Sequence, residues 1–183
     1  MAGPMVSVAV VGALARIARV AATNGGSRAL QREVERFFRD YGPLGLDNES
    51  SRPTSVLSEA KLVEWCLCVI AENNPEPVAA HQVAATITQR LEDVERQIDY
   101  HDGRFRDLPS VTDLVEFIWL YVGDAALGRY EVRRCAECGA FFLVTDNRQR
   151  YCPPPTRGGK SRCLTRRQMR EKRVAQRVPS SHG

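Results

Sequence analysis

Four cysteines in the last third of this 183-residue chain constrain its fold most strongly. Two residues separate Cys135 from Cys138, 13 more precede Cys152, and a further ten precede Cys163. A Cys-x2-Cys pair lets both thiolates point at one ion, and Gly139 can take the backbone turn that follows. Two more cysteines complete the tetrahedral set that Zn²⁺ prefers. We therefore predict one structural zinc site, closed to water and so not catalytic, formed by Cys135, Cys138, Cys152 and Cys163.

The residues around the cysteines predict a short hairpin followed by a helix. Residues 141–144 are Phe-Phe-Leu-Val, a run typical of a strand, and residues 146–148 are Asp-Asn-Arg, a turn signal. We predict that residues 150–152 form the returning strand. Cys163 falls on the first turn of a last helix, with Ser161 as its N-cap. Such a hairpin buries little by itself, so metal binding is expected to supply about 10 kcal/mol or more of its folding energy.

Charge is divided unevenly along the chain. Residues 131–183 hold 13 of the 26 Lys and Arg but only 4 of the 22 Asp and Glu, so a basic segment follows an acidic body. Five arginines in this segment are spaced three or four residues apart, on one face of the last predicted helix. Guanidinium groups suit phosphates and guanine edges. We therefore predict nucleic-acid binding, with DNA as the expected partner, by Arg162, Arg166, Arg167, Arg170, Arg173 and Arg177. Contact with a protein or a membrane surface, and a solvated helix without a partner, remain open.

Residues 1–130 are predicted to form an all-α domain, residues 131–178 the zinc-finger module, and residues 179–183 a disordered tail. Apolar periodicity and capping residues predict five helices in the first domain. They are Val6–Thr23, Arg28–Asp40, Ser55–Glu72, about Pro77 to Ile98, and Ser110 to Leu127, with a loop at 44–53. The first is apolar all round, which suits burial or contact with a partner. Ser110 and Asp113 resemble a capping box for the fifth. Cys66 and Cys68 face different directions on the third and are predicted to be buried small residues, not ligands.

The sequence also argues against several classes of function. The apolar stretch 6–15 precedes Arg16 and Arg19, whereas a signal peptide has its positive charges first, and a membrane span needs about 20 apolar residues. We therefore expect a cytoplasmic protein with no membrane partner, where paired cysteines bind metal more often than they form disulfides. No nucleophile–histidine set and no Gly-rich phosphate loop stands out, so we do not expect an enzyme.

The cysteine segment follows the order Cys135-x2-Cys138-Gly139-x2-Phe142, Asp146, Arg150-Tyr151-Cys152 and Cys163-x2-Arg166. This order resembles the CGNR-type zinc-finger family of bacterial proteins. The resemblance covers residues 133–173. The tetrapeptide that names the family is here Cys-Leu-Thr-Arg, and a Pro/Gly-rich insertion lengthens the gap before Cys163. The resemblance implies a DNA-binding, transcription-regulator-like module placed after a helical domain.

Two functional hypotheses follow. In the first, the chain is a DNA-binding transcriptional regulator whose helical domain senses a signal or forms a homodimer. In the alternative, it is a protein-interaction or scaffold module in which the zinc site is purely structural and the first helix docks a partner.

Overall fold

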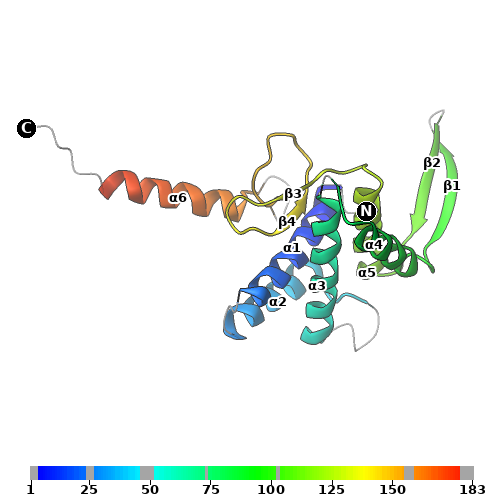
Figure 1. Cartoon of the computed structure of the whole chain (residues 1–183), viewed down its shortest axis with the longest axis horizontal. Helices are drawn as coiled ribbons and strands as arrows, with labels where there is room; N and C mark the ends of the chain where they lie inside the picture. The colour runs from blue at the N-terminus through cyan, green and yellow to red at the C-terminus, as the bar shows by residue number, and fades with distance from the viewer. Residues whose placement is uncertain are drawn as a thin grey trace, which may run out of the picture.

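The computed structural model describes residues 4–23, 27–45, 52–72, 74–101, 104–154 and 159–177, with the backbone alone for residues 4–8, 27, 96–101, 104–108 and 177. Within these ranges the protein has six helices and two antiparallel β-hairpins (Figure 1). The predicted mainly-α class is therefore confirmed. The tail at 179–183 and residues 46–51 of the predicted loop lie outside the described residues.

Helices and strands follow one another as α1 (Pro4–Ala22), α2 (Ser27–Tyr41), α3 (Pro53–Ile70), α4 (Pro77–Arg90), β1 (Glu95–His101), β2 (Arg104–Ser110), α5 (Leu114–Ala126), β3 (Val132–Arg134), β4 (Phe141–Leu143) and α6 (Arg162–Arg177). Helices α1, α2, α3 and α5 agree with the sequence prediction to within about one turn. No helix in the described part of the chain is both long enough and apolar enough to cross a lipid bilayer.

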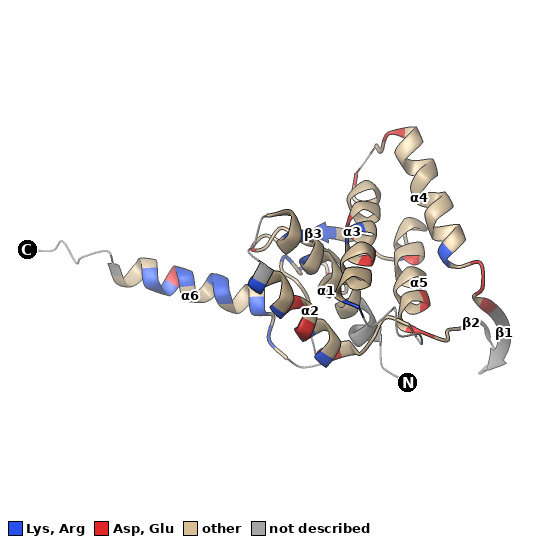
Figure 2. Cartoon of the chain, turned by 90° about the horizontal axis from the view of Figure 1, so that it is seen from below, with Lys and Arg blue, Asp and Glu red and all other residues tan. Residues whose placement is uncertain are grey.

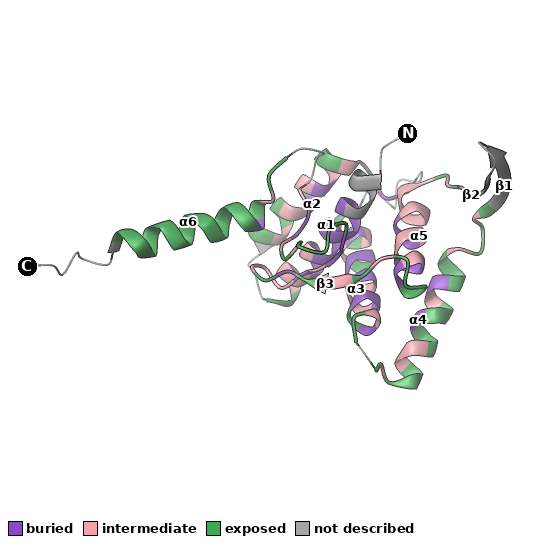
Figure 3. Cartoon of the chain, turned by 90° about the horizontal axis from the view of Figure 1, so that it is seen from above, coloured by how far each residue is buried: buried purple, intermediate pink, exposed green. Residues whose placement is uncertain are grey.

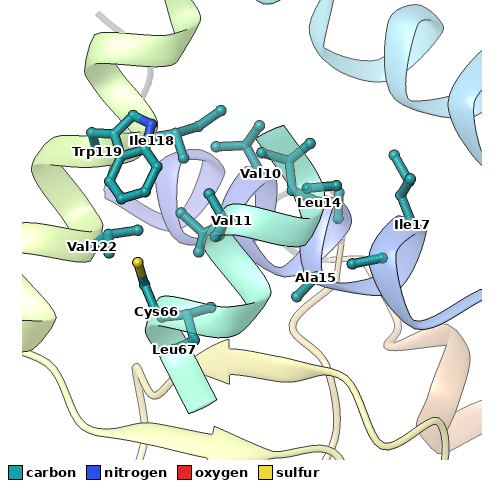
Figure 4. Close-up of a cluster of buried hydrophobic side chains, with 14 of the residues drawn as sticks. Val10, Val11, Leu14, Ala15, Ile17, Cys66, Leu67, Ile118, Trp119 and Val122 are labelled. Atoms are coloured by element: carbon teal, nitrogen blue, oxygen red, sulfur yellow. The ribbon is translucent and has the colours of Figure 1, made fainter. Parts of the chain in front are cut away.

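Helix α1 lies at the centre of the fold. Val10, Val11, Leu14 and Ile17 are at most 1% exposed, and α1 packs against α2, α3, α5 and β4. Figure 4 shows these side chains meeting residues of α3 and α5, among them Trp119. A helix that is apolar all round needs neighbours on every side. The rest of this chain supplies them, so burial explains the composition of α1.

The predicted fourth helix is wrong beyond Arg90. Helix α4 ends there, and β1 pairs with β2 in an antiparallel register that runs from Glu95–Ser110 to His101–Arg104. Residues 1–130 therefore contain a hairpin as well as helices. Apolar residues continue at helical spacing as far as Ile98, although the helix itself ends at Arg90. The Asp-Gly dipeptide at 102–103 between two β-rich stretches is the signal that favours a hairpin.

Helix α5 begins three residues later than the predicted capping box. Its N-cap is Asp113, whose carboxylate accepts a hydrogen bond from the Glu116 N–H at 2.9 Å. The Glu116 carboxylate in turn accepts from the Thr112 N–H at 2.6 Å. Ser110 cannot cap this helix because it is the last residue of β2. At the other end, Gly128 has φ 73° and closes the helix one residue after the predicted end at Leu127.

A buried carboxylate joins three of the helices. Glu59 of α3 accepts hydrogen bonds from the Trp119 indole N–H of α5 and, at 3.0 Å, from the Arg90 guanidinium of α4. The Arg90 guanidinium also lies 5.8 Å from the centre of the Trp119 ring. Since a buried charge without partners is strongly unfavourable, this network is a structural feature of the core.

The apolar core crosses the domain boundary predicted at residue 130. Ala140 and Leu143 are fully buried in the same cluster as Val11, Leu67 and Trp119. Strand β4 packs directly on α1 and α3. The cysteine-bearing hairpin therefore shares its hydrophobic core with the helical body.

Candidate metal centre and basic helix

The four predicted metal ligands converge. Their Sγ atoms all lie within 4.8 Å of one another, and those of Cys138 and Cys152 are 3.5 Å apart. A tetrahedral ion with metal–sulfur bonds of about 2.3 Å needs sulfur–sulfur separations of about 3.8 Å. A disulfide needs about 2.05 Å, and all six cysteines of the chain are free. The cluster could therefore hold one metal ion.

Short local motifs bring the four sulfurs together. Cys135 follows β3 directly, and the Gly139 N–H donates to its carbonyl at 2.9 Å while the Cys135 N–H donates to the Ala140 carbonyl at 2.8 Å. Gly139 has φ 73°, so it takes the predicted turn without steric strain. At α6, the Leu164 N–H donates to Ser161 Oγ at 3.3 Å, which confirms the predicted N-cap. This cap fixes the first turn of α6, which carries the fourth cysteine.

The strand pairing around the cysteines differs from the prediction. Strand β4 pairs with β3, which precedes the first cysteine pair, and residues 150–152 form no strand. The tight turn between the first two cysteines returns the chain on itself, so the segments that flank it become neighbours. The Arg133 guanidinium donates to the Asn147 carbonyl at 2.7 Å and holds the later segment as an irregular loop. The predicted turn is present, because the Arg148 N–H donates to the Asp146 carboxylate at 2.8 Å.

The cluster is shielded from solvent. Cys135, Cys152 and Cys163 are buried and Cys138 is half-buried, and Phe142, Val144 and Tyr151 pack around them. Phe142 and Tyr151 therefore serve to pack the cysteine cluster. Four sulfur donors in an apolar setting suit a structural ion that makes no contact with substrate.

Arg16 of α1 reaches the cluster from the helical body. Burial alone would lower the pKa of its guanidinium, but the charge of the Cys152 thiolate, and then a hydrogen bond with it, raise that pKa overall. A divalent ion held by four thiolates leaves two net negative charges, which a buried guanidinium partly offsets. Arg16 is not among the site residues predicted from the sequence. The signal for it was a cation within an otherwise apolar helix.

The thiols of the cluster shift one another's pKa. Hydrogen bonds from Cys138, Cys152 and Cys163 lower the pKa of Cys135, whereas the bonds of Cys152 with Cys135 and then Cys138 raise the pKa of Cys152. Four negative charges this close repel, so the cluster retains protons until a cation replaces them. Metal binding must therefore release protons, and metal affinity must fall as the pH falls.

The other two cysteines lie on α3, apart from the cluster. Cys66 is buried, and burial, followed by the charge of Glu59, raises the pKa of its thiol to about 12. Cys68 is exposed. The prediction of a buried, non-ligating residue is thus confirmed for Cys66, and the predicted burial of Cys68 is wrong because α3 turns that face toward solvent.

Helix α6 projects away from the rest of the protein (Figure 1). Every residue from 164 to 176 is exposed (Figure 3). Lys and Arg recur along its whole length (Figure 2). The helix is therefore attached to the protein through its first turns alone.

The structure divides the predicted nucleic-acid-binding arginines into groups. Arg162 and Arg166, in the first turns of α6, line a cavity beside the metal cysteines. Arg170 forms an ion pair with the buried carboxylate of Glu137, and Arg167 pairs with its own helix neighbour Glu171 at 2.6 Å. Arg173 is exposed without an ion pair to any described residue, and Arg177 is described by its backbone alone.

The chain was also compared with known proteins. No protein-family model, no curated protein and no solved structure matches it. Its function is therefore inferred from the geometry of its own residues.

Proposed function

We propose that this chain is a cytoplasmic zinc protein that binds nucleic acid, with DNA as the ligand and transcriptional regulation as the role. Helix α6 is the binding element. The observation that carries the proposal is the form of that helix: 16 residues, seven of them Lys or Arg and one of them Glu, that stand clear of the body. Ion pairs with Glu171 and Glu137 neutralise two of these cations, and a polyanion would neutralise the others, which gain nothing from packing.

The dimensions of α6 support the same proposal. A 16-residue helix is about 24 Å long, and the major groove of DNA, about 12 Å wide, accommodates one helix. Projection from the body leaves both sides of α6 accessible to the groove walls, where phosphates lie. The resemblance of residues 133–173 to the CGNR-type family implies this role as well.

Zinc would act here by positioning. Four cysteine thiolates in a tetrahedral set are the donors that favour Zn²⁺ over harder ions. Because Cys163 belongs both to the cluster and to the first turn of α6, the ion would tie the helix to the hairpin. A reducing cytoplasm keeps these thiols available for metal.

The ion pairs of α6 refine the expected contacts. The Glu137 side chain is 2% exposed, so Arg170 has a buried partner that holds it toward the hairpin. Arg173 and Lys172 have no such partner among the described residues and are free to meet phosphates. The Arg167–Glu171 pair is exposed on both sides, so a phosphate can replace the carboxylate.

The double substitution Lys172→Gln with Arg173→Gln tests the proposal. Fluorescence polarisation with duplex DNA, measured over a series of salt concentrations on zinc-quantified protein, should show binding weakened by about tenfold and a salt slope reduced by about 1.8, because two phosphate contacts are lost. The control Arg39→Gln with Lys61→Gln removes the same charge from α2 and α3 and should leave the slope unchanged. An equal loss of DNA affinity in both double variants would show that net charge alone causes the effect, and would refute α6 as the binding element. A partner protein captured despite nuclease treatment, without DNA binding, would favour the scaffold alternative.

A further inference from the structure

A cavity of about 280 Å³ lies where α1, α2 and the cysteine module meet. Five arginines from three helices line it, although they are far apart in the sequence. They are Arg16 and Arg19 of α1, Arg36 of α2, and Arg162 and Arg166 of α6. Cys138, Cys152 and Pro153 form part of the opposite wall. The cavity thus joins the helical body to the base of the projecting helix.

Positive charge remains in this cavity after the local anions are counted. Glu33 is the single carboxylate among the described lining residues, and it pairs with Arg36. A divalent ion in the adjacent cluster would leave two further negative charges on the four thiolates. Five guanidinium groups exceed these three charges by two, or by one when Asp40 of the adjoining recess is counted as well. The first turn of α6 also lines the cavity, and a helix N-terminus adds partial positive charge. Like charges held together in this way are unfavourable unless an anion joins them.

Tyr41 supplies an independent indication of a ligand. Its hydroxyl is buried and has no hydrogen-bond partner within the described part of the chain. Tyr41 does not line the cavity itself; it lines a small adjoining recess that shares Arg16, Glu33 and Arg36 with the cavity and also contains Asp40. An unsatisfied buried hydroxyl is rare and unfavourable. A hydroxyl donor held beside arginines is suited to an anionic acceptor.

We propose that the cavity binds a small molecule through a phosphate group. Guanidinium groups form paired, charge-assisted hydrogen bonds with phosphate oxygens, and the Tyr41 hydroxyl in the adjoining recess could donate one more to a ligand group that extends into that recess. A volume of about 280 Å³ lies near the lower end of ligand pockets, which fits a small phosphate compound. Such a ligand would contact Arg16 and Arg36 of the body together with Arg162 of α6, and so would link the two parts. This site does not depend on nucleic-acid binding by α6, so either proposal can fail alone.

Isothermal titration calorimetry on the metal-loaded full chain tests the site, with inorganic phosphate and pyrophosphate as probes at constant ionic strength. We expect sub-millimolar binding of at least one probe. Arg36→Gln and Arg162→Gln should each weaken it by at least about tenfold, because each removes a charged hydrogen-bond donor. Their matched controls on the same helices, Arg39→Gln and Arg173→Gln, should change it less than about twofold. Arg36→Lys keeps the charge and should recover part of the affinity.

Tyr41→Phe separates ligand binding from folding. It should weaken probe binding by several-fold and leave the melting temperature of the ligand-free protein unchanged or higher, since it removes an unsatisfied hydroxyl. Absence of probe binding in protein with a full metal content would overturn the proposal, as would equal losses in Arg36→Gln and Arg39→Gln. If a DNA duplex binds, phosphate and pyrophosphate do not, and Arg36→Gln weakens the duplex, the cavity takes a nucleic-acid phosphate and the small-molecule proposal is refuted.

Discussion

Metal removal should weaken the helical body of this protein as well as its cysteine hairpin. Leu143 and Ala140 belong to the same buried cluster as the side chains of α1, and Phe142 is fully buried beside the cysteines. These residues stay in place only while the hairpin keeps its form. A hairpin with two three-residue strands has little stability of its own, so the ion is expected to maintain that form.

The size of the effect follows from the side chains that would be released. Burial of one Phe or Leu is worth about 1.5–3 kcal/mol, so loss of Phe142 and Leu143 from the core corresponds to about 3–6 kcal/mol. In a chain of this length, 1 kcal/mol moves the melting temperature by about 2–4 °C. We therefore expect the unfolding midpoint of the helices to fall by roughly 5–25 °C when the metal is removed.

Far-UV circular dichroism follows this transition, because most of the helices lie in the body. Melting curves should be recorded under reducing conditions for metal-loaded protein, for chelator-treated protein, and for the double variant Cys135→Ser with Cys138→Ser. Cys68→Ser is the matched control, because it removes an exposed thiol outside the cluster. Hydrogen exchange should show lost protection in α1 as well as in the hairpin.

An unchanged helical midpoint in protein shown to be free of metal would refute this reasoning. The hairpin would then behave as an independent module after residue 130, and the contacts of Leu143 with α1 would contribute little to stability. A shift of the same size in Cys68→Ser would show that thiol loss in general, and not loss of the ion, is responsible.

Two further predictions concern the interior of the body. Arg90→Met should lower the free energy of unfolding by about 1–3 kcal/mol in urea titrations because it leaves the Glu59 carboxylate with fewer partners. Arg90→Met combined with Glu59→Gln should recover part of that loss, because glutamine removes the charge and keeps an acceptor for the Trp119 N–H. A larger loss in the double variant would contradict this account. The pKa of Cys66 is raised by burial to about 12, so the folded state holds this proton at pH values where the unfolded state has released it. Stability should therefore fall as the pH rises from about 9 toward 12, and Cys66→Ala should flatten this part of the stability–pH profile; an identical slope in the variant would exclude Cys66 as the cause.

The metal cluster and the core helices were predictable because their signals are local. Two residues between Cys135 and Cys138 bring the two sulfurs to one side of a turn, whatever the rest of the chain does. Helix α1, which is apolar on every side apart from Arg16 and Arg19, likewise has to be buried. Pairing of β4 was not predictable in the same way, because two short segments, residues 132–134 before it and residues 150–152 after it, were both near enough in sequence to pair with it. Its pairing with β3 depends on how tightly the chain turns at Gly139.

The contacts of the arginines, in contrast, could not be predicted from local sequence. Helical spacing places five of them on one face of α6, but spacing does not indicate which end of the helix lies against the body. The ion pair of Arg170 with Glu137 and the position of Arg162 beside the cavity depend on tertiary contacts. Arg16, Arg19 and Arg36 were missed as a group for the same reason, since they meet only after α1 and α2 have packed together.

Because α6 is attached near one end, a small rotation at that end displaces the other end by a larger distance. The contacts that hold α6 to the rest of the protein are the Cys163 thiol, in its first turn, and the Arg170–Glu137 ion pair, two turns later. A tilt of about 10° about the first turn would move the far end of a helix about 24 Å long by roughly 4 Å. Small changes in the geometry of the cysteine cluster are therefore amplified along α6. The part of the molecule most sensitive to the state of the sulfurs is the end of the helix farthest from them.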